Sequence, residues 1–138
     1  MNTILNPYIN FNGNARDAMT FYESVFGGNL TISSFKDMGQ SAAVADDSKI
    51  MHSDLRSDNG MVLMAADDVG DAKSKTGNNC SVSLSGDNAE ELTGYYNKLS
   101  EGGVILQPLS QAPWGDSFGM FTDKFSVLWL VNITGKKT

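Results

Sequence analysis

A pattern of strand, turn and helix that occurs twice constrains the fold of this chain more than any other feature. The first copy, residues 6–28, reads NPYINFNGNARDAMTFYESVFGG, and the second, residues 80–103, reads CSVSLSGDNAEELTGYYNKLSEGG. In each copy apolar residues first alternate with polar ones, as in a strand, and then recur at helical spacing up to a pair of glycines. The repetition predicts two modules of the same design.

Both predicted helices have a start and an end that the chain indicates. Asn14 and Asp87 are of the residue type that accepts hydrogen bonds from the first N–H groups of a helix, and an acidic residue follows each of them three positions later. The helices are expected to end at the glycine pairs that close with Gly28 and Gly103. Each module should therefore open with one short strand and one amphipathic helix.

Three further strands are expected in each copy, separated by turn residues. They cover residues 30–35, 50–55 and 61–67 in the first copy and residues 104–106, 117–121 and 126–133 in the second. The fold class is then α+β, with two βαβββ modules. Because a unit of this size cannot bury its sheet alone, we expect a single domain in which the modules form a curved mixed sheet around a cavity. Module one spans about residues 1–68, a linker about 69–79 and module two about 80–138.

Composition excludes several classes of protein. The 138 residues are 41% hydrophobic and 19% charged, which suits one packed domain and not a disordered chain. A net charge of -6 argues against DNA or RNA as a partner, because phosphate contacts need a surplus of Lys and Arg. The one cysteine, Cys80, cannot form an internal disulfide, and we expect neither a signal peptide nor a membrane span. The sequence indicates a cytoplasmic protein without nucleic-acid or membrane partners.

Four segments carry a resemblance to a known superfamily: PYINFNGNARDAMTFYESVFGG, IMHSDLRSDNGMVLMAADD, SLSGDNAEELTGYYNKLSEGG and FGMFTDKFSVLWLVNI. Together they span nearly the whole chain. Through them the chain resembles the vicinal oxygen chelate superfamily, which includes glyoxalase I, bleomycin-resistance proteins and extradiol dioxygenases, and within it the PhnB-like proteins. The resemblance implies a glyoxalase-like fold and a homodimer. It also implies that enzymes of the superfamily bind a divalent metal through one ligand on the first strand and one on the fourth strand of each module, usually His or Gln and then Glu.

The resemblance places each fourth-strand ligand four residues beyond a turn residue. In module one the turn residue is Gly60 and the ligand position is Met64; in module two they are Ser126 and Leu130. Sites of this type use carboxylate and imidazole groups, so neither Met64 nor Leu130 is expected to bind a hard metal ion.

The first-strand positions depend on the register of the strand, and two registers stay open. Counting back from the helix cap gives Pro7 and Cys80, whereas the alternation of apolar residues puts Tyr8 and Ser81 on the cavity face. We favour Tyr8 and Ser81. In either register at most one of the four positions, Cys80, could bind a metal, so we expect no metal and no other cofactor.

The single histidine, His52, is a candidate for catalysis. Asp54 follows it by two residues in a predicted strand, so both side chains should point to the same face. If that face lines the cavity, Asp54 could orient the imidazole as a general base. A lone histidine in a strand is more often a hydrogen-bonded structural residue, and this interpretation is favoured, so the catalytic residues stay unknown. Cys80 is disfavoured as a nucleophile because its neighbours supply no positive charge.

Two functions remain open from the sequence. The first is binding of a small organic molecule, without a metal, in the cavity between the modules; the alternative is a metal-dependent lyase, isomerase or dioxygenase of the glyoxalase type. Aromatic side chains commonly line small-ligand pockets, and Trp114, in a loop, is expected to face the ligand, while Trp129 could line the pocket or belong to the core. Residues 36–49 are interpreted as a flap over the cavity. The residues expected to contact the ligand are Tyr8, Asn10, His52, Met64, Ser81, Trp114 and Leu130.

Overall fold

The chain divides into two compact units, residues 1–75 and 76–138. The computed structural model describes residues 3–68, 77 and 79–135. The predicted linker, residues 69–79, lies outside the described residues apart from residues 77 and 79. That the two modules make one domain around a cavity stays a prediction.

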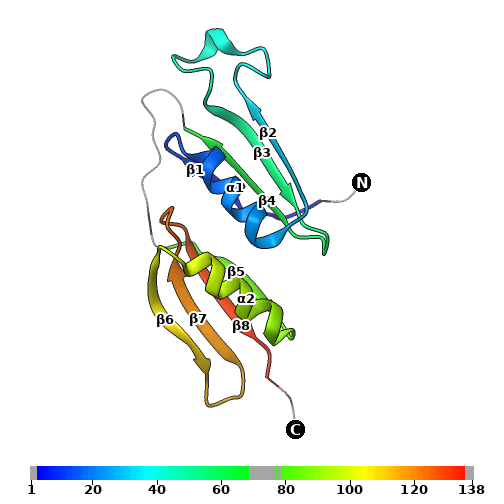
Figure 1. The fold of residues 1–138 in the computed structure, drawn as a ribbon, viewed down its shortest axis with the longest axis vertical. Helices are drawn as coiled ribbons and strands as arrows, with labels where there is room; N and C mark the ends of the chain where they lie inside the picture. Colours follow the sequence, from blue (N-terminus) through cyan, green and yellow to red (C-terminus); the bar gives the residue numbers. More distant parts are fainter. Residues whose placement is uncertain (1–2, 69–76, 78, 136–138) are drawn as a thin grey trace. The chain divides into compact units, whose positions relative to one another are not determined.

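Both modules have the predicted element order, as Figure 1 shows. Module one consists of β1 (Tyr8–Phe11), α1 (Ala15–Phe26), β2 (Asn29–Ser34), the short 3-10 helix η1 (Ser41–Ala43), β3 (Ile50–Arg56) and β4 (Val62–Asp67). Module two consists of β5 (Val82–Gly86), α2 (Ala89–Ser100), β6 (Val104–Gln111), β7 (Ser117–Thr122) and β8 (Leu128–Ile133). The repeat of strand, helix and three strands is confirmed, with η1 as the only addition among the described residues. Neither helix is long and apolar enough to cross a membrane in the part of the chain that is described.

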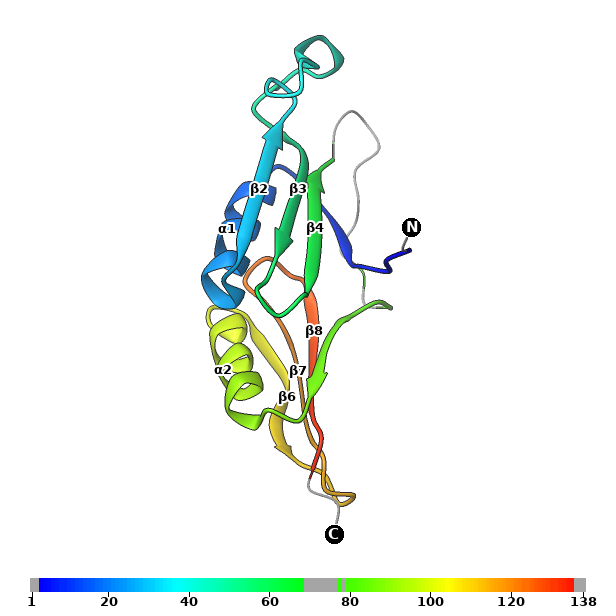
Figure 2. The same ribbon diagram turned by 90° about the vertical axis from the view of Figure 1, so that its right-hand side faces the viewer.

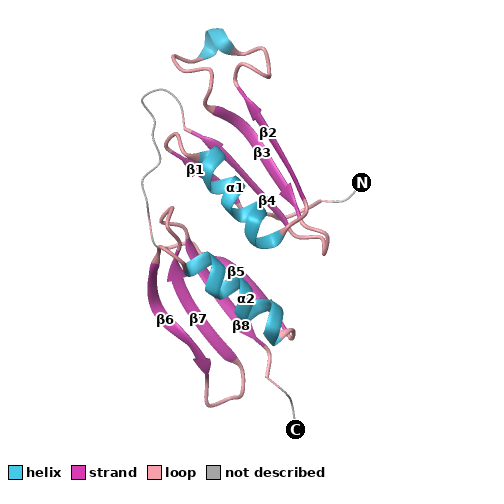
Figure 3. Ribbon diagram, in the orientation of Figure 1, coloured by secondary structure: helices cyan, strands magenta, loops and turns pink. Residues whose placement is uncertain are grey.

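Each module forms its own four-stranded mixed sheet, with the order β1-β4-β3-β2 in module one and β5-β8-β7-β6 in module two. In both sheets the first strand pairs in parallel with the last, and the other pairs are antiparallel. Neither sheet closes into a barrel. Figure 3 shows the loop between β2 and β3, with η1 at its far end, as the longest excursion from the first sheet.

One helix packs on one face of each sheet, as Figure 2 shows. In module one the buried side of α1 includes Ala18, Met19 and Tyr22, all fully buried. In module two Tyr96 of α2 meets Phe121 of β7 edge to face, with ring centroids 5.2 Å apart. Burial of an aliphatic or aromatic side chain of this size stabilises the fold by about 1.5–3 kcal/mol. The apolar stripe of each helix therefore holds it on its sheet and leaves the opposite face of the sheet without a helix.

The start of α1 is capped across the module and not by its neighbour in sequence. Asn14 occupies the N-cap position, but its side chain makes no capping hydrogen bond. Instead the Oδ1 atom of Asp67, at the end of β4, accepts hydrogen bonds from the N–H groups of Gly13 and Ala15 at 3.0 and 2.9 Å. Its Oδ2 atom accepts from the N–H of Ile50, at the start of β3, at 2.9 Å. One buried carboxylate thus holds the ends of three segments together.

The start of α2 is capped locally, at a position one residue after the predicted one. Asn88 is the N-cap, and its side chain accepts a hydrogen bond from the N–H of Glu91 at 3.1 Å. The prediction that Asp87 caps this helix is therefore wrong. Both residue types can cap a helix, and the position is decided by where the backbone enters helical geometry.

Two equivalent glycines follow the helices because the backbone passes close to a neighbouring strand there. A Cβ atom on Gly28 would lie 2.2 Å from the carbonyl oxygen of Arg56, and one on Gly103 would lie 2.0 Å from the carbonyl oxygen of Thr122. Arg56 ends β3 and Thr122 ends β7. The second glycine of each pair is thus required by the approach of the next strand.

We predict that Gly103→Ala destabilises module two by more than about 2 kcal/mol, because the added methyl group would overlap backbone atoms that cannot move independently. The matched control is Gly94→Ala within α2, where a Cβ atom meets nothing within 4 Å. That change should stabilise by about 0.5–1 kcal/mol, because alanine favours a helix over glycine. Urea unfolding is followed by the fluorescence of the buried Trp129 in a Trp114→Phe background. Equal effects of the two substitutions would contradict the close approach.

A second prediction concerns the Asp67 carboxylate. Asp67→Ala should remove the acceptor of three hydrogen bonds and lower the free energy of unfolding by about 2–5 kcal/mol, whereas Asp58→Ala in the exposed turn after β3 should change it little. Asp67→Asn keeps one oxygen, so Gly13 and Ala15 should keep hydrogen-exchange protection while Ile50 loses it. Unchanged protection at all three amides in both Asp67 variants would show that the carboxylate does not hold these segments.

Candidate functional site

The face of the first sheet that lies opposite α1 carries most of the residues predicted to bind a ligand. Along β1, Phe11 is buried on the helix side, whereas Tyr8 is 46% exposed. Tyr8 is the Cα partner of Met64, and Asn10 is the Cα partner of Ala66. Alternation along the strand therefore puts Tyr8 and Asn10 on the face without a helix, as the apolar pattern predicts, and Pro7 lies before the strand begins. We call this face of β1, β4 and β3 the open face of module one.

His52, Asp54 and Arg56 lie on the same open face, because they alternate with the buried Ser53 and Leu55 along β3. Asp54 is the Cα partner of Met64, which is in turn the partner of Tyr8. The rings of Tyr8 and His52 have centroids 6.1 Å apart and are tilted by 33°. The structure thus brings Tyr8, His52, Asp54 and Met64 together.

The carboxylate of Asp54 is paired with Arg56 and not with His52. The Nε atom of Arg56 donates to Oδ1 of Asp54 at 3.1 Å, and its Nη2 atom donates to Oδ2 at 3.2 Å. The Asp54 side chain is 17% exposed, whereas that of Arg56 is 56% exposed. No hydrogen bond joins Asp54 to His52 among the described residues, so the structure provides no carboxylate that orients the imidazole. Sequence reasoning missed Arg56, although its spacing of two residues from Asp54 indicates the same face.

The corresponding open face of module two is formed by alternate residues of β5, β8 and β7. Leu130 faces away from α2, since its neighbours Trp129 and Val131 are buried in the core. Its Cα partners are Ser83 on β5 and Met120 on β7. Just as Tyr8 pairs with Met64, Ser83 pairs with Leu130, so the structural counterpart of Tyr8 is Ser83. Ser81 is exposed and precedes β5.

The two tryptophans lie in different surroundings. Trp129 is 1% exposed, and its Nε1–H donates to Oδ2 of the buried Asp123 at 2.9 Å, so it belongs to the core. Oδ1 of Asp123 also accepts from the N–H groups of Phe125 and Val127. Trp114 is 76% exposed in the loop between β6 and β7. Its predicted contact with a ligand stays a prediction.

The residues at the four ligand positions do not suit a divalent metal. The strand pairs place a phenol and a thioether together in module one, at Tyr8 and Met64, and a hydroxyl and an alkyl group together in module two, at Ser83 and Leu130. Hard divalent ions in sites of this type are bound by imidazole and carboxylate groups. Among the residues that the structure describes, no group of three or more His, Cys, Asp or Glu side chains is placed to bind a metal.

A separate pocket lies at the start of α1. It has a volume of about 390 Å³ and is lined by residues from the start of α1, the ends of β2 and β4 and the β2–β3 loop: Gly13, Arg16, Asp17, Ser34, Lys36, Asp37, Ser48, Ile50 and Asp67. The loop interpreted as a flap is held near its base by hydrogen bonds from the N–H groups of Phe35 and Lys36 to the carbonyl groups of Lys49 and Asp47. Residues 36–49 therefore extend the β2–β3 hairpin, and three of them, Lys36, Asp37 and Ser48, line this pocket.

Asp37 is the group in this pocket whose titration is shifted. Its pKa lies below the ordinary value, first because the N–H of Ser34 donates to its Oδ2 atom at 3.0 Å and second because of a hydrogen bond with the Ser34 side chain, with weaker attraction from Arg16 and Lys36. The stability that these contacts contribute is present at neutral pH and is lost as the pH falls through the lowered pKa. The pocket thus has a carboxylate that is already engaged within its own loop.

The chain is similar to proteins of known structure over nearly its whole length. A family model described as 3-demethylubiquinone-9 3-methyltransferase matches residues 3–132. The crystal structure of protein PA1353 from Pseudomonas aeruginosa is 38% identical, covers 98% of this chain and 100% of its own, and has a TM-score of 0.85. A PhnB protein from Bacillus cereus is 24% identical over 96% of this chain and 100% of its own, with a TM-score of 0.73.

A more distant structure shows how far the fold extends. The glyoxylase/bleomycin resistance protein/dioxygenase domain from Frankia sp. EAN1pec is 10% identical, covers 99% of this chain and 94% of its own, and has a TM-score of 0.67. The chain thus has the fold of that superfamily, and the resemblance drawn from its sequence is confirmed. With the family model matching almost its whole length, the chain belongs to the PhnB-like family, which is described as 3-demethylubiquinone-9 3-methyltransferase.

Proposed function

We propose that the chain binds a small organic molecule without a metal, on the open faces of its modules. The observation that carries this proposal is the composition of the positions where chelating members of the superfamily have metal ligands. Tyr8, Met64, Ser83 and Leu130 offer aromatic, apolar and hydroxyl surface there. Surface of this kind, with a few polar groups, is what small-molecule pockets use.

The ionisable residues of module one support binding over catalysis. His52 lies on the open face, but Asp54 is paired with Arg56, so the imidazole lacks the carboxylate partner that a general base commonly uses. The metal-dependent enzyme stays the alternative, and it requires a ligand set that these four positions do not supply.

A homodimer is part of the proposal, on the resemblance to the superfamily. The structure offers one surface that a second copy could cover: Val104, Ile105 and Leu106 at the start of the edge strand β6 are 60%, 51% and 53% exposed. Exposed apolar runs on edge strands are unusual in proteins that remain monomers. Sedimentation velocity should therefore show a dimer, and Ile105→Lys should weaken it; a monomer at all micromolar concentrations would remove this part of the proposal.

Thermal stability in the presence of ligands tests the proposal as a whole. In a panel of small organic molecules at least one should raise the melting temperature, because a ligand at a hundredfold its dissociation constant stabilises by about 2.7 kcal/mol. Zinc, manganese and nickel should give no specific stabilisation. Native mass spectrometry of protein purified without chelator should show no divalent ion. A stoichiometric, tightly bound divalent ion would contradict this proposal and favour the metal-dependent enzyme.

A redesigned variant serves as the positive control for the measurements with metal ions. Tyr8→His with Met64→Glu and Ser83→His with Leu130→Glu supplies two imidazoles and two carboxylates at strand-paired positions. Provided that circular dichroism shows it folded, this variant should be stabilised by zinc. A variant with Ser81→His in place of Ser83→His should bind zinc more weakly. The reverse order would show that the register on β5 is assigned wrongly.

A further inference from the structure

The sequence contains two asparagines that glycine follows, Asn12 and Asn59. An asparagine in this setting can lose its side-chain ammonia when the backbone nitrogen of the next residue attacks the side-chain carbonyl carbon. Glycine favours the attack because it has no Cβ atom to hinder the approach. Both pairs lie in exposed turns of module one: Asn12-Gly13 between β1 and α1, and Asn59-Gly60 between β3 and β4. They differ in how the attacking nitrogen is held.

The nitrogen of Gly13 is held by a buried carboxylate. Its N–H donates to Oδ1 of Asp67 at 3.0 Å, and Asp67 is only 7% exposed. The same carboxylate accepts from two further N–H groups, those of Ala15 and Ile50. The Gly13 nitrogen would have to leave this arrangement before it could attack Asn12. The negative charge of Asp67 also opposes removal of the Gly13 proton, which the attack requires.

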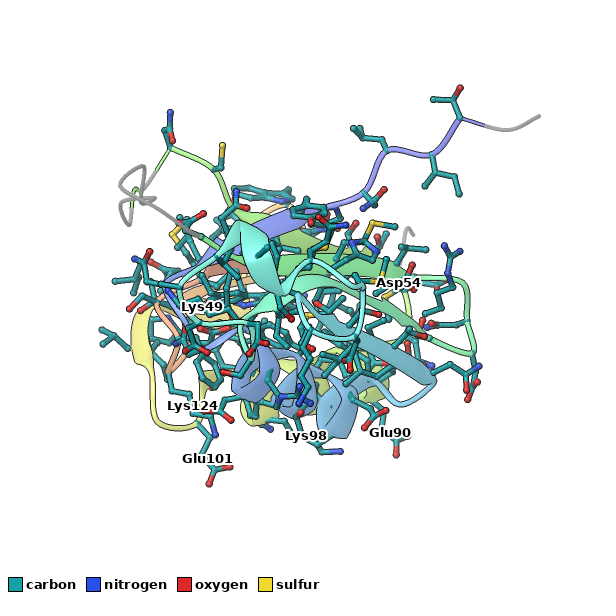
Figure 4. The ribbon with its side chains drawn as sticks, turned by 90° about the horizontal axis from the view of Figure 1, so that it is seen from above. Lys49, Asp54, Glu90, Lys98, Glu101 and Lys124 are labelled. Carbon is teal, nitrogen blue, oxygen red and sulfur yellow. The ribbon has the colours of Figure 1, made fainter. Side chains whose placement is uncertain are left out.

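The nitrogen of Gly60 is held only by the turn itself. Its N–H donates to the carbonyl oxygen of Ser57 at 3.1 Å, so its acceptor is uncharged. A hydrogen bond within an exposed turn opens at small cost, because water replaces the lost partner. Figure 4 shows β3, which carries the labelled Asp54, leading outward into this turn. The Gly60 nitrogen is therefore the more available of the two.

The side chain of Asn59 is polarised for the attack. The hydroxyl of Ser57 donates to Oδ1 of Asn59, which makes the carbon that receives the nitrogen more electrophilic. The same hydroxyl oxygen accepts from the N–H of Met61 at 2.9 Å, which fixes it in the turn. Negative charge that develops on Oδ1 during the attack would thus meet a donor that is already in place.

We propose that Asn59 is a site of spontaneous covalent modification, at which the chain forms a succinimide with Gly60. The Gly60 nitrogen gives up its proton and bonds to Cγ of Asn59, the Cγ–Nδ2 bond breaks, and Nδ2 leaves with a proton as ammonia. Water then adds to either carbonyl group of the ring and opens it, which leaves aspartate or isoaspartate. The turn that joins β3 to β4 thereby gains a carboxylate. Asp67 protects Asn12 from the same reaction.

Peptide mapping by mass spectrometry tests the assignment on the folded wild-type protein, incubated for days at mildly alkaline pH. Asn59 should lose its amide at least about tenfold faster than Asn12, because only the Gly13 nitrogen is held by a charged partner. Isoaspartate should appear beside aspartate, since the opening of the ring yields both. In urea both asparagines should react at similar rates, because each is followed by glycine and neither retains its folded contacts.

Substitutions separate the roles of the surrounding groups. Ser57→Ala should slow the reaction of Asn59 severalfold, whereas Ser57→Thr, which keeps the hydroxyl, should react like the wild type. Asp67→Ala should raise the rate at Asn12 toward that in urea. Circular dichroism establishes whether each variant is folded. If Asp67→Ala is unfolded, the comparison of folded and urea-denatured wild-type protein decides whether Asn12 is protected.

Three outcomes would overturn the inference. A reaction at Asn12 as fast as at Asn59 in the folded protein would show that Asp67 does not protect the first pair. Aspartate without isoaspartate would indicate direct hydrolysis of the amide and not a succinimide. An Asn59 amide that persists in the folded protein as long as that of Asn12, while both are lost in urea, would show that the turn blocks the attack.

Discussion

The buried carboxylate of Asp67 is the contact on which the geometry of module one depends. It accepts hydrogen bonds from N–H groups at the start of α1 and at the start of β3, and it stands at the end of β4. The helix is thereby fixed to one face of the sheet, next to the strand that carries Met64. In module two Asn88 caps the helix, and Asp123 organises the turn before β8 and binds the buried Trp129. Both arrangements leave the opposite face of the sheet uncovered.

That uncovered face explains how one scaffold can serve several chemistries. The helix side of each sheet is filled by apolar residues such as Tyr22 and Phe121, and changes there cost stability. The open face is free of this constraint, so its residues can change without loss of that packing. In this chain the first and fourth strands carry Tyr8 beside Met64 and Ser83 beside Leu130. These side chains offer contact surface where other members of the superfamily are expected to offer metal ligands.

Much of this could be predicted from the sequence because it depends on local periodicity. Alternation set Tyr8 on the open face, and the repeated glycine pairs marked the helix ends. The capping of α1 could not be predicted, since Asp67 lies more than fifty residues from the amides that it binds. Ser83 was missed because the alternation of apolar residues gives Ser81 and Ser83 the same face, and only the strand pairing shows that Ser83 lies opposite Leu130. Trp129 has a core role that only its contact with Asp123 shows.

The central claim is that ligands bind on the faces of the sheets opposite the helices. Amide chemical-shift mapping by NMR, during a titration with a small molecule that raises the melting temperature of the protein, tests this claim most directly. The account predicts saturating shifts along β1, β3 and β4 of module one and along β7 and β8 of module two, with little change in α1 and α2. Shifts confined to the helices or to the pocket around Arg16 and Lys36, or shifts that do not saturate, would contradict it.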